Sequence, residues 1–233
     1  MLVSVEKNHL EKPTCGPTRF LLVRHGETDW NREKRIQGHT DVPLNDTGIE
    51  QATAVANYIA GYERDVAAIY SSDLQRARVT AETIARKYNL AVSADACLRE
   101  GYMGQAQGLL VAEYEERFGA TRKTLDESHT DIFVRWNYSE VPDSEPRNSV
   151  LKRVHGHMAK IAQIHENKTV VLVTHAGVIR TLILASIAHD RELFQRYCGN
   201  IGVRPHRHQI ANCAIIEFAY QNQTCVFKKI HEF

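Results

Sequence analysis

The stretch Arg19-Phe-Leu-Leu-Val-Arg-His-Gly-Glu-Thr28 decides the fold of this chain of 233 residues. Residues 19–23 form an apolar run of strand length, which is typical of a parallel strand buried on both faces of a sheet. The run stops at Arg24-His25-Gly26, where polar side chains and a glycine replace the apolar ones. Ligand sites of open parallel sheets lie beyond the carboxyl ends of the strands. The stretch therefore predicts a central strand with a functional site directly after it.

Further strand patterns follow along the chain. The most strand-like segment, Thr169–Thr174, ends at His175-Ala176-Gly177, and a shorter apolar run covers Val66–Tyr70. Residues Leu90–Leu98 are predicted as a third strand or an extended connection. Two C-terminal segments are predicted as a hairpin around Gln221–Gln223, namely Ile210–Ala219 and Thr224–Ile230.

Helices are expected between these strands. The first has Thr47 and Glu50 at the spacing of a capping box. Helical periodicity covers Thr47–Tyr62, Leu74–Tyr88, Val111–Phe118, Asn148–His165 and Val178–Ala188. The alternation of strands and helices predicts an α/β fold, a three-layer sandwich with a mainly parallel sheet covered on both faces.

Composition and charge exclude several classes of protein. Hydrophobic residues make up 43% and charged residues 24%, which excludes a disordered or collagen-like chain. The 29 Lys and Arg against 28 Asp and Glu leave a net charge of +1, so a general nucleic-acid binder is not expected. No apolar run approaches the roughly 20 residues that span a bilayer, and the five cysteines form no CxxC pair. We expect a cytoplasmic protein with free thiols and without nucleic-acid or membrane partners, and leave its oligomeric state open.

The chain is predicted as a single domain. Residues 1–18 form a polar N-terminal extension that lacks the apolar core of a signal peptide. Residues 19–233 form the domain itself. Its pattern becomes irregular over about residues 101–147, which we interpret as an insertion on the substrate side.

Polar side chains gather at three of the predicted strand ends. Arg24 and His25 follow the first strand, and His175 follows the most strand-like segment. Ser71-Ser72 leads to Arg76 after the second strand. Arginines suit a dianionic phosphoryl group, because their forked donors match its oxygens. These side chains therefore predict a phosphate pocket.

The two histidines are predicted to act on phosphorus rather than to bind a metal. Neighbouring arginine cations would repel a metal ion, whereas a neutral histidine ring can attack phosphorus and form a phosphohistidine. The arginines and the second histidine would stabilise the transition state. Glu100 follows the third extended segment and is the candidate for protonating the leaving alkoxide and then activating water. This chemistry needs no metal and no cofactor.

Four ordered blocks of sequence match a known family. They are Arg24–Thr28 with the positions that follow it, Tyr70–Arg78 with Thr80-Ala81, Leu98-Arg99-Glu100, and Val173–Gly177. Together they resemble the signature of the histidine phosphatase superfamily, in its phosphoglycerate mutase-like branch. The resemblance covers about residues 19–185 and implies the phosphoglycerate mutase-like architecture.

The resemblance also implies a role for each matching position. His25 would be the phosphorylated nucleophile, and Glu100 the proton donor. Arg24, Arg76 and His175 would complete the phosphate pocket. Substrate-side contacts are implied for Asn31, Gln37, Gly38 and the backbone N–H of Ala176.

The predicted function is a metal-independent phosphomonoesterase that acts through phospho-His25 on a small phosphorylated metabolite, such as a sugar phosphate or phosphoglycerate. Phosphoglycerate mutases carry a longer aromatic and basic insertion that is not seen here, which favours hydrolysis. Two stretches depart from the family pattern: Arg147-Asn148-Ser149 stands where Gly-Glu-Ser is common, and Gly104–Gly108 replaces a Trp-Glu pair. The alternatives are a phosphoglycerate mutase-type isomerase that needs a bisphosphate primer, and a non-catalytic phosphate-binding protein.

Other histidines are interpreted as structural. His155-Gly-His157 and His206-Arg-His208 have no Cys, Asp or His partner at ligand spacing in the sequence, so no metal site is predicted. The basic cluster Arg204–His208 is interpreted as a solvated loop, with a second anionic contact to the substrate as the alternative.

Overall fold

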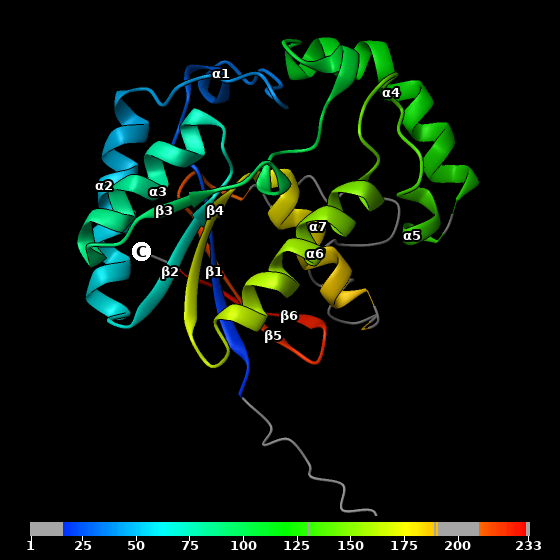
Figure 1. Ribbon diagram of the computed structural model, residues 1–233. Helices are drawn as coiled ribbons and strands as arrows, with labels where there is room; N and C mark the ends of the chain where they lie inside the picture. The colour runs from blue at the N-terminus through cyan, green and yellow to red at the C-terminus, as the bar shows by residue number, and fades with distance from the viewer. Residues whose placement is uncertain (1–15, 130, 189, 191–209, 232–233) are drawn as a thin grey trace, which may run out of the picture.

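A single six-stranded sheet forms the centre of the computed structural model, which describes residues 16–129, 131–188, 190 and 210–231 (Figure 1). The strand order is β3-β2-β4-β1-β5-β6. The first four strands in this order are parallel, and β5 and β6 form an antiparallel hairpin at one edge. This confirms the predicted mainly parallel sheet. The strands are β1 (Thr18–Arg24), β2 (Val66–Ser71), β3 (Val92–Ala94), β4 (Thr169–Thr174), β5 (Ile215–Gln221) and β6 (Thr224–His231).

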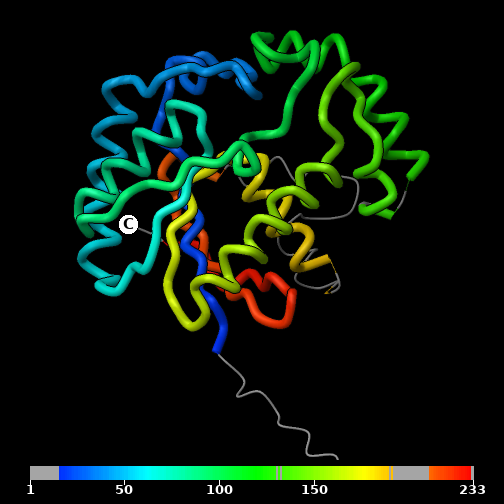
Figure 2. Tube along the Cα trace, viewed as in Figure 1, coloured from blue at the N-terminus to red at the C-terminus, as the bar shows by residue number. Residues whose placement is uncertain are grey.

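The central strands end at the same level. In the parallel pair of β1 and β4, Arg24 lies opposite Thr174, so the next residues, His25 and His175, leave the sheet side by side. Ser71, the last residue of β2, is paired with Val173 of β4. Figure 2 shows β1 and β4 running next to each other through the middle of the fold. The register thus brings three strand ends to one edge of the sheet.

Helices cover both faces of this sheet (Figure 1). On β1, Leu21 and Val23 face one helical layer, whereas Phe20 and Leu22 face the other. The alternation produces two separate hydrophobic cores and confirms the three-layer arrangement. The first layer contains α2 (Asp46–Tyr62) and α3 (Gln75–Tyr88), and the second contains α6 (Arg147–Ile164) and α7 (Ala176–Ile187).

Two element boundaries differ from the predicted ones because side chains cap the backbone. Helix α2 is capped by Asn45, whose side chain accepts a hydrogen bond from the Gly48 N–H at 2.9 Å, and not by a capping box from Thr47. The third strand is shorter than predicted. After β3, the Asp95 side chain accepts from the Cys97 N–H at 2.7 Å and starts a 3₁₀ turn over Ala96–Leu98.

The terminal hairpin begins later than predicted, at Ile215 rather than Ile210. Cys213 has a φ of 60° and donates its N–H to the Arg24 carbonyl oxygen, so the chain turns here before it can pair as a strand. At the hairpin tip, Asn222 and Gln223 both have positive φ, which is typical of the tight turns that join twisted strands.

Residues between the 3₁₀ turn and α6 carry three further helical segments at one side of the sheet (Figure 1). Helix α4 (Val111–Ser128) continues past the predicted end at Phe118, with polar residues in its second half. A small core joins it to the following loop. The four-residue helices α1 (Asp29–Arg32) and α5 (Ile132–Arg135) were not expected, since so short a segment shows no periodicity; a 3₁₀ turn spans Gly104–Ala106. The substrate-side role of 101–147 stays a prediction.

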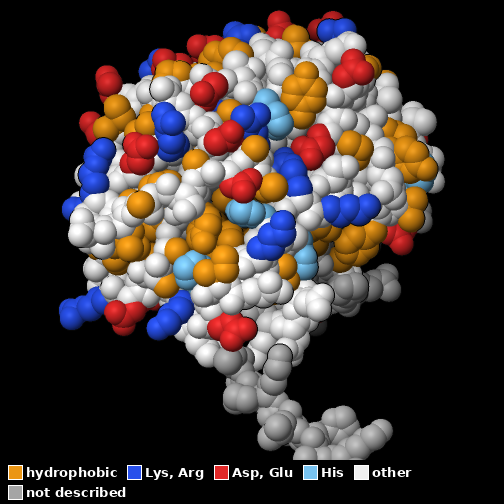
Figure 3. All heavy atoms as spheres, in the orientation of Figure 1, with side chains coloured by type: hydrophobic (Ala, Val, Ile, Leu, Met, Phe, Trp, Pro, Cys, Tyr) orange, Lys and Arg blue, Asp and Glu red, His pale blue; other side chains and the backbone are white. Residues whose placement is uncertain are grey.

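No helix in the described ranges is long and apolar enough to cross a bilayer. On the face drawn in Figure 3, Lys and Arg side chains are interspersed with Asp and Glu. Strand β1 begins at Thr18, one residue before the predicted domain boundary. The predicted extension therefore lies almost wholly outside the described residues, as does the basic cluster Arg204–His208.

Candidate functional site

The two histidines predicted to act on phosphorus face each other at the carboxyl edge of the sheet. Their ring centroids are 5.1 Å apart, with an angle of 59° between the ring planes. Both side chains are buried, with 3% of His25 and 1% of His175 exposed. The His25 N–H donates to the Thr174 carbonyl oxygen at 3.1 Å, which ties the loop after β1 to the end of β4.

His25 is held as a neutral ring with a defined tautomer. Its Nδ1 lies 2.7 Å from the Gly26 carbonyl oxygen, which can only accept, so Nδ1 carries the proton. The other nitrogen, Nε2, therefore carries a lone pair, and it has no hydrogen-bond partner in the described part of the chain. Burial lowers the pKa of His25 well below 6.5, and the cations Arg24 and Arg76 lower it further. The Nε2 lone pair is thus available, as the predicted role of His25 as a nucleophile requires.

Gly26 allows the loop after β1 to pack closely against helix α2. A Cβ atom at this position would lie 2.4 Å from the Gly48 carbonyl oxygen. The Gly26 N–H donates to the Thr80 hydroxyl at 3.1 Å, and this hydroxyl donates to the Arg76 carbonyl oxygen at 2.8 Å. The backbone beside His25 is therefore connected to the helix that carries Arg76.

In each of the two arginines the buried Nε has no hydrogen-bond partner in the described residues. Arg76 donates from its two terminal nitrogens to the carbonyl oxygens of Thr40 and Gly38, both at 2.8 Å, but its Nε is buried without a partner. Arg24 donates to the Ile210 carbonyl oxygen, and its Nε is likewise unpartnered. Burial lowers the pKa of each arginine to about 10, so both remain cationic at neutral pH. Buried donors are rarely left unsatisfied in folded proteins, so these two Nε atoms are candidate contacts for a ligand.

His175 also has buried nitrogen atoms that lack hydrogen-bond partners. Both of its ring nitrogens are buried and have no hydrogen-bond partner in the described chain. Burial lowers the pKa of His175 well below 6.5, and the charges of Arg76, His25 and Arg24 act in the same direction. His25, His175, Arg24 and Arg76 therefore lie within electrostatic range of one another. Each of them has at least one nitrogen atom without a hydrogen-bond partner in the described residues.

Glu100 is fixed beside the first turn of helix α7. Its two carboxylate oxygens accept hydrogen bonds from the N–H groups of Gly101 and Gly177, both at 2.9 Å. A Cβ atom on Gly177 would lie 2.3 Å from Glu100 Oε1, so only glycine leaves room for the carboxylate. The charge of Glu100 opposes the lowering of the pKa of both Arg24 and Arg76. Glu100 thus belongs to the same cluster as the predicted phosphate-binding arginines.

The positions predicted to contact substrate lie in different surroundings. Asn31 Oδ1 is engaged within the protein, where it accepts from Thr28 and from the Asn212 side chain. Gln37 is 8% exposed, and its Oε1 has no partner in the described residues. The Gly38 carbonyl oxygen binds Arg76. Ala176 is the first residue of α7 and follows His175 directly.

Several residues that sequence reasoning missed hold this arrangement in place. Asn212 donates its side-chain amide to the His25 carbonyl oxygen at 3.0 Å. His39 Nε2 lies 2.7 Å from the Glu100 carbonyl oxygen, which Arg153 also contacts at 3.0 Å. Thr80 lies inside a matched block, but no role had been assigned to it. The other three lie outside the matched blocks and bind through backbone atoms of distant segments, so the sequence carries no signal for them.

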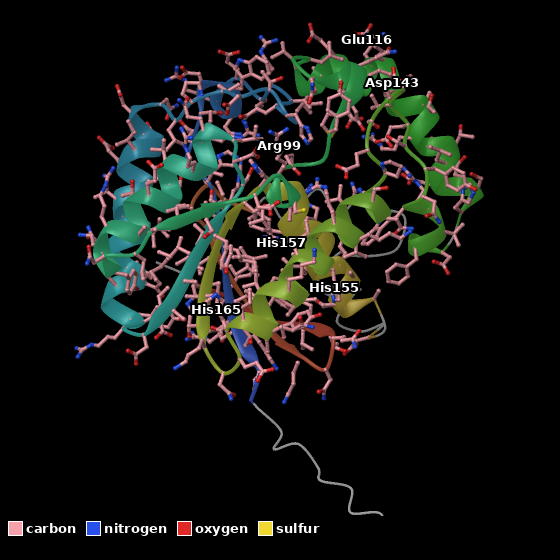
Figure 4. The ribbon with its side chains drawn as sticks, viewed as in Figure 1. Arg99, Glu116, Asp143, His155, His157 and His165 are labelled. Atoms are coloured by element: carbon pink, nitrogen blue, oxygen red, sulfur yellow. The ribbon has the colours of Figure 1, made fainter. Side chains whose placement is uncertain are left out.

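The histidines on α6 do not form a site as a pair (Figure 4). The ring of His155 lies against Tyr220, with centroids 5.5 Å apart, whereas His157 meets Asp95 and Cys97. Spacing in the sequence does not indicate this group, in which ligand atoms of the three residues lie within 4.8 Å of one another. However, His157 Nε2 is buried without a partner, while the second nitrogen of a ligating histidine is normally hydrogen-bonded. His206-Arg-His208 lies outside the described residues.

Comparisons with known proteins agree with this geometry. The model of the histidine phosphatase superfamily (branch 1) matches residues 20–232. The chain is 36% identical over 180 residues to "Phosphoglycerate mutase-like protein 4" of Arabidopsis thaliana, covering 76% of this chain and 75% of the relative. It is 38% identical over 169 residues to "Metal-independent phosphoserine phosphatase" of the same plant, covering 72% and 68%.

Solved structures give the same result. A phosphoserine phosphatase of Entamoeba histolytica in complex with phosphoserine superposes with a TM-score of 0.71 at 29% identity, covering 91% of this chain and 96% of the other. A mycobacterial glucosyl-3-phosphoglycerate phosphatase has a TM-score of 0.73 at 25% identity, covering 93% and 98%. The predicted enzyme class, a phosphoric monoester hydrolase, is confirmed by the family match and these relatives. The chain therefore belongs to the histidine phosphatase superfamily, in the branch of the phosphoglycerate mutase-like proteins.

Proposed function

We propose that this protein hydrolyses a small phosphorylated metabolite through a phosphohistidine formed on His25. The observation that carries the proposal is the state of the His25 ring. Its Nδ1 proton is held by the Gly26 carbonyl oxygen, and its free Nε2 lies beside two arginine cations. A neutral ring with one lone pair available is what an attack on phosphorus requires.

In the first step, His25 Nε2 forms a bond to phosphorus while the bond from phosphorus to the alcohol oxygen breaks. Arg24, Arg76 and His175 supply the donors for the three equatorial oxygens, whose charge is greatest in the transition state. Glu100 gives a proton to the departing alkoxide, so the product leaves as a neutral alcohol. The carboxylate position beside Gly177 suits this role, since it is fixed by two backbone N–H groups.

In the second step, a water molecule attacks the phosphorus of phospho-His25. Glu100, now ionised, accepts the proton from that water, and the bond between His25 Nε2 and phosphorus breaks. Inorganic phosphate leaves, and the original protonation states return. In both steps Glu100 carries out the proton transfer, first to the alcohol and then from the water, so the scheme does not require a metal ion to activate either group. The printed name of one relative, a metal-independent phosphoserine phosphatase, supports this part of the proposal.

The substrate class follows from the relatives and stays a proposal for this chain. Names of relatives refer to phosphoserine and to glucosyl-3-phosphoglycerate. Both are small phosphomonoesters of alcohols. We therefore propose a phosphorylated metabolite of the phosphoglycerate, phosphoserine or sugar phosphate class.

The test is turnover of a panel of such esters in EDTA by the wild-type protein and by His25→Ala. We expect phosphate release by the wild type in EDTA, and a loss of at least about a thousandfold in kcat for the variant with its fold intact, because the covalent route is gone. Denaturation of the wild type in alkaline SDS during turnover of ³²P-labelled substrate should trap label on His25, and the label should be lost in acid, as expected of a phosphohistidine. Normal rates in His25→Ala would refute the mechanism.

Isomerase activity is the main alternative, and one relative bears the name of a probable phosphoglycerate mutase at 30% identity. The same panel decides between the two functions when 2,3-bisphosphoglycerate is added. Phosphate release without this primer supports the hydrolase. Interconversion of phosphoglycerates that depends on the primer, with no net release of phosphate, would identify a mutase.

A further inference from the structure

Two arginines outside the catalytic cluster lack the partners that buried cations normally have. Arg147 is the first residue of helix α6, and Arg180 lies in the second turn of α7, after His175. Arg180 Nε is buried and makes no hydrogen bond. Across the described residues, neither guanidinium group forms a hydrogen bond or an ion pair. Both side chains nevertheless retain some exposure to solvent.

These arginines extend the positive charge of the catalytic pocket. The charge of Arg180 lowers the pKa of Arg24 in the phosphate site and also that of Arg147. Burial is the larger cause of the lowered pKa of both Arg147 and Arg24. Arg180 lies five residues after His175 on α7, and α6, which begins at Arg147, packs against α7 in the same core, so the two cations extend from the phosphate site toward the start of α6. Like charges at such positions repel one another and oppose folding unless an anion lies among them.

Nearby carboxylates are already engaged by other groups. Glu140 faces Arg147, but its oxygens accept from the Tyr114 hydroxyl and from Arg135 at 3.4 Å. Glu100 is held by backbone N–H groups on the catalytic side. Among the described residues, Glu140 therefore offsets part of the charge of Arg147, but no carboxylate forms an ion pair with either arginine.

We propose that Arg147 and Arg180 bind a second anionic group of the substrate, a carboxylate or a second phosphate, while its phosphoryl group lies at His25. This inference rests on the proposed function and specifies the substrate it accepts. Forked guanidinium donors match both carboxylate and phosphate oxygens. The substrate would thus be a doubly anionic phosphomonoester, and an ester without the second acidic group would bind less tightly.

The local sequence agrees with such a specific site. Arg147 stands where the family pattern often has glycine, and Asn148 stands where it often has glutamate. The Asn148 amide donates to the Phe133 carbonyl oxygen at 3.0 Å and provides no negative charge. The stretch therefore adds a cation and carries no carboxylate at the start of α6.

The experiment compares matched substrate pairs that differ in the second acidic group. O-phosphoserine is paired with O-phosphoethanolamine, which lacks its carboxylate, and 3-phosphoglycerate with glycerol 3-phosphate. Fructose 1,6-bisphosphate and fructose 6-phosphate test the second phosphate. The ratio of kcat/KM within each pair is measured for the wild type, Arg147→Gln and Arg180→Gln. Arg64→Gln is the charge-matched control, because Arg64 is exposed and lies just before β2, at the opposite end of the strands.

We expect the wild type to favour the doubly anionic member of at least one pair by about 10- to 100-fold, the range of charge-assisted hydrogen bonds. Either Gln variant should bring that ratio close to one, mainly through KM, while Arg64→Gln leaves it unchanged. The substrate pair whose kcat/KM ratio changes in the Gln variants shows whether the second acidic group is a carboxylate or a phosphate. Ratios that are near one in the wild type, or equal in all four proteins, would overturn the inference.

A binding measurement separates this inference from the proposed hydrolysis. Calorimetric titration of the His25→Ala protein with O-phosphoserine and with O-phosphoethanolamine does not depend on turnover. Tighter binding of O-phosphoserine that is lost in a His25→Ala, Arg147→Gln double variant supports the subsite even if no substrate is hydrolysed. Equal affinities for both ligands would refute it. Arg180→Lys keeps the charge if Arg180→Gln fails to fold, and should then lose selectivity only in part.

Discussion

At the scale of single residues, Gly177 determines where the carboxylate of Glu100 can lie. Its N–H donates to one carboxylate oxygen, and its missing side chain leaves space for the other. A methyl group there would come within 2.3 Å of Glu100 Oε1, far inside van der Waals contact. The proton donor would therefore have to leave the position from which it reaches the alkoxide.

We expect Gly177→Ala to lower kcat for alkyl phosphates by about 100-fold, at the lower end of the roughly 10²–10⁴-fold that a placed general acid contributes. Hydrolysis of p-nitrophenyl phosphate should fall much less, because its phenolate leaves without protonation. Steady-state rates on both esters measure the difference. Alanine at Gly61, whose Cβ would meet nothing within 4 Å, is the control for an added methyl group. An equal loss on both esters would show that the methyl group does not act through protonation of the leaving group, and would place its effect on the shared hydrolysis of phospho-His25 or on the fold.

The residues that could be predicted are those inside the matched blocks, where a polar side chain follows an apolar strand. His25 and His175 are of this kind, whereas Glu100 follows a 3₁₀ turn and was predicted from its matched block. Arg147 and Arg180 were not predicted as a pair, because their relation exists only once two helices of one layer are packed. Whether a cation lacks a counter-charge depends on its three-dimensional surroundings, so the spacing of residues in the sequence does not reveal it.

At the scale of elements, helix α6 positions the turn that carries Glu100. Arg153 donates from one terminal nitrogen to the carbonyl oxygens of Cys97 and Arg99, both at 2.8 Å, and from the other to that of Glu100 at 3.0 Å. Its remaining bonds go to the Glu145 carboxylate. One side chain thus fixes the backbone of three residues around the proton donor.

Replacing Arg153 by lysine should lower kcat about tenfold with a smaller change in KM, since an ammonium group cannot reach three carbonyl oxygens in fixed directions. Stability should fall as well, by about 1–3 kcal/mol for the buried groups left unpaired. Rates and thermal unfolding midpoints are measured alongside Lys152→Ala, an exposed neighbour on the same helix. If KM rose while kcat stayed constant, Arg153 would act on binding and not on the position of Glu100.

Strand and helix cores could be predicted from apolar periodicity, whereas their ends could not. The run at Thr169–Thr174 coincides with β4, because burial on both faces selects apolar residues throughout. The start of α2 was placed one residue late, since Asn45 competes with Thr47 for the cap. Such choices depend on single side-chain hydrogen bonds worth about 1 kcal/mol, which no pattern of hydrophobicity records.

At the scale of the whole molecule, neutral buried histidines couple the fold to pH. The pKa values of His25 and His175 are lowered well below 6.5 in the folded protein, while the unfolded chain binds protons near 6.5. Below that pH the unfolded state therefore holds more protons than the folded state, so stability must fall as the pH falls. The pKa values of His157, His165 and His231 are lowered too, which adds to the effect.

We expect the free energy of unfolding to be steady above about pH 7 and to decrease below pH 6.5, by about 1.4 kcal/mol per pH unit for each fully neutral histidine. Urea unfolding between pH 5.5 and 7.5 measures the slope. His25→Ala removes one of the two rings and should show a shallower decrease. A slope that is flat, or the same in both proteins, would contradict the assignment of a neutral His25.

The pairing of β1 with β4 also has a consequence for the order of events during synthesis. β1 leaves the ribosome early, but its parallel partner is made only after most of the chain, and contacts so distant in sequence form late. Until β4 arrives, a nascent chain has His25 but neither His175 nor the glycine that holds Glu100. On the proposed mechanism, the growing polypeptide therefore has no phosphatase activity, and hydrolysis begins only after β4 has paired with β1.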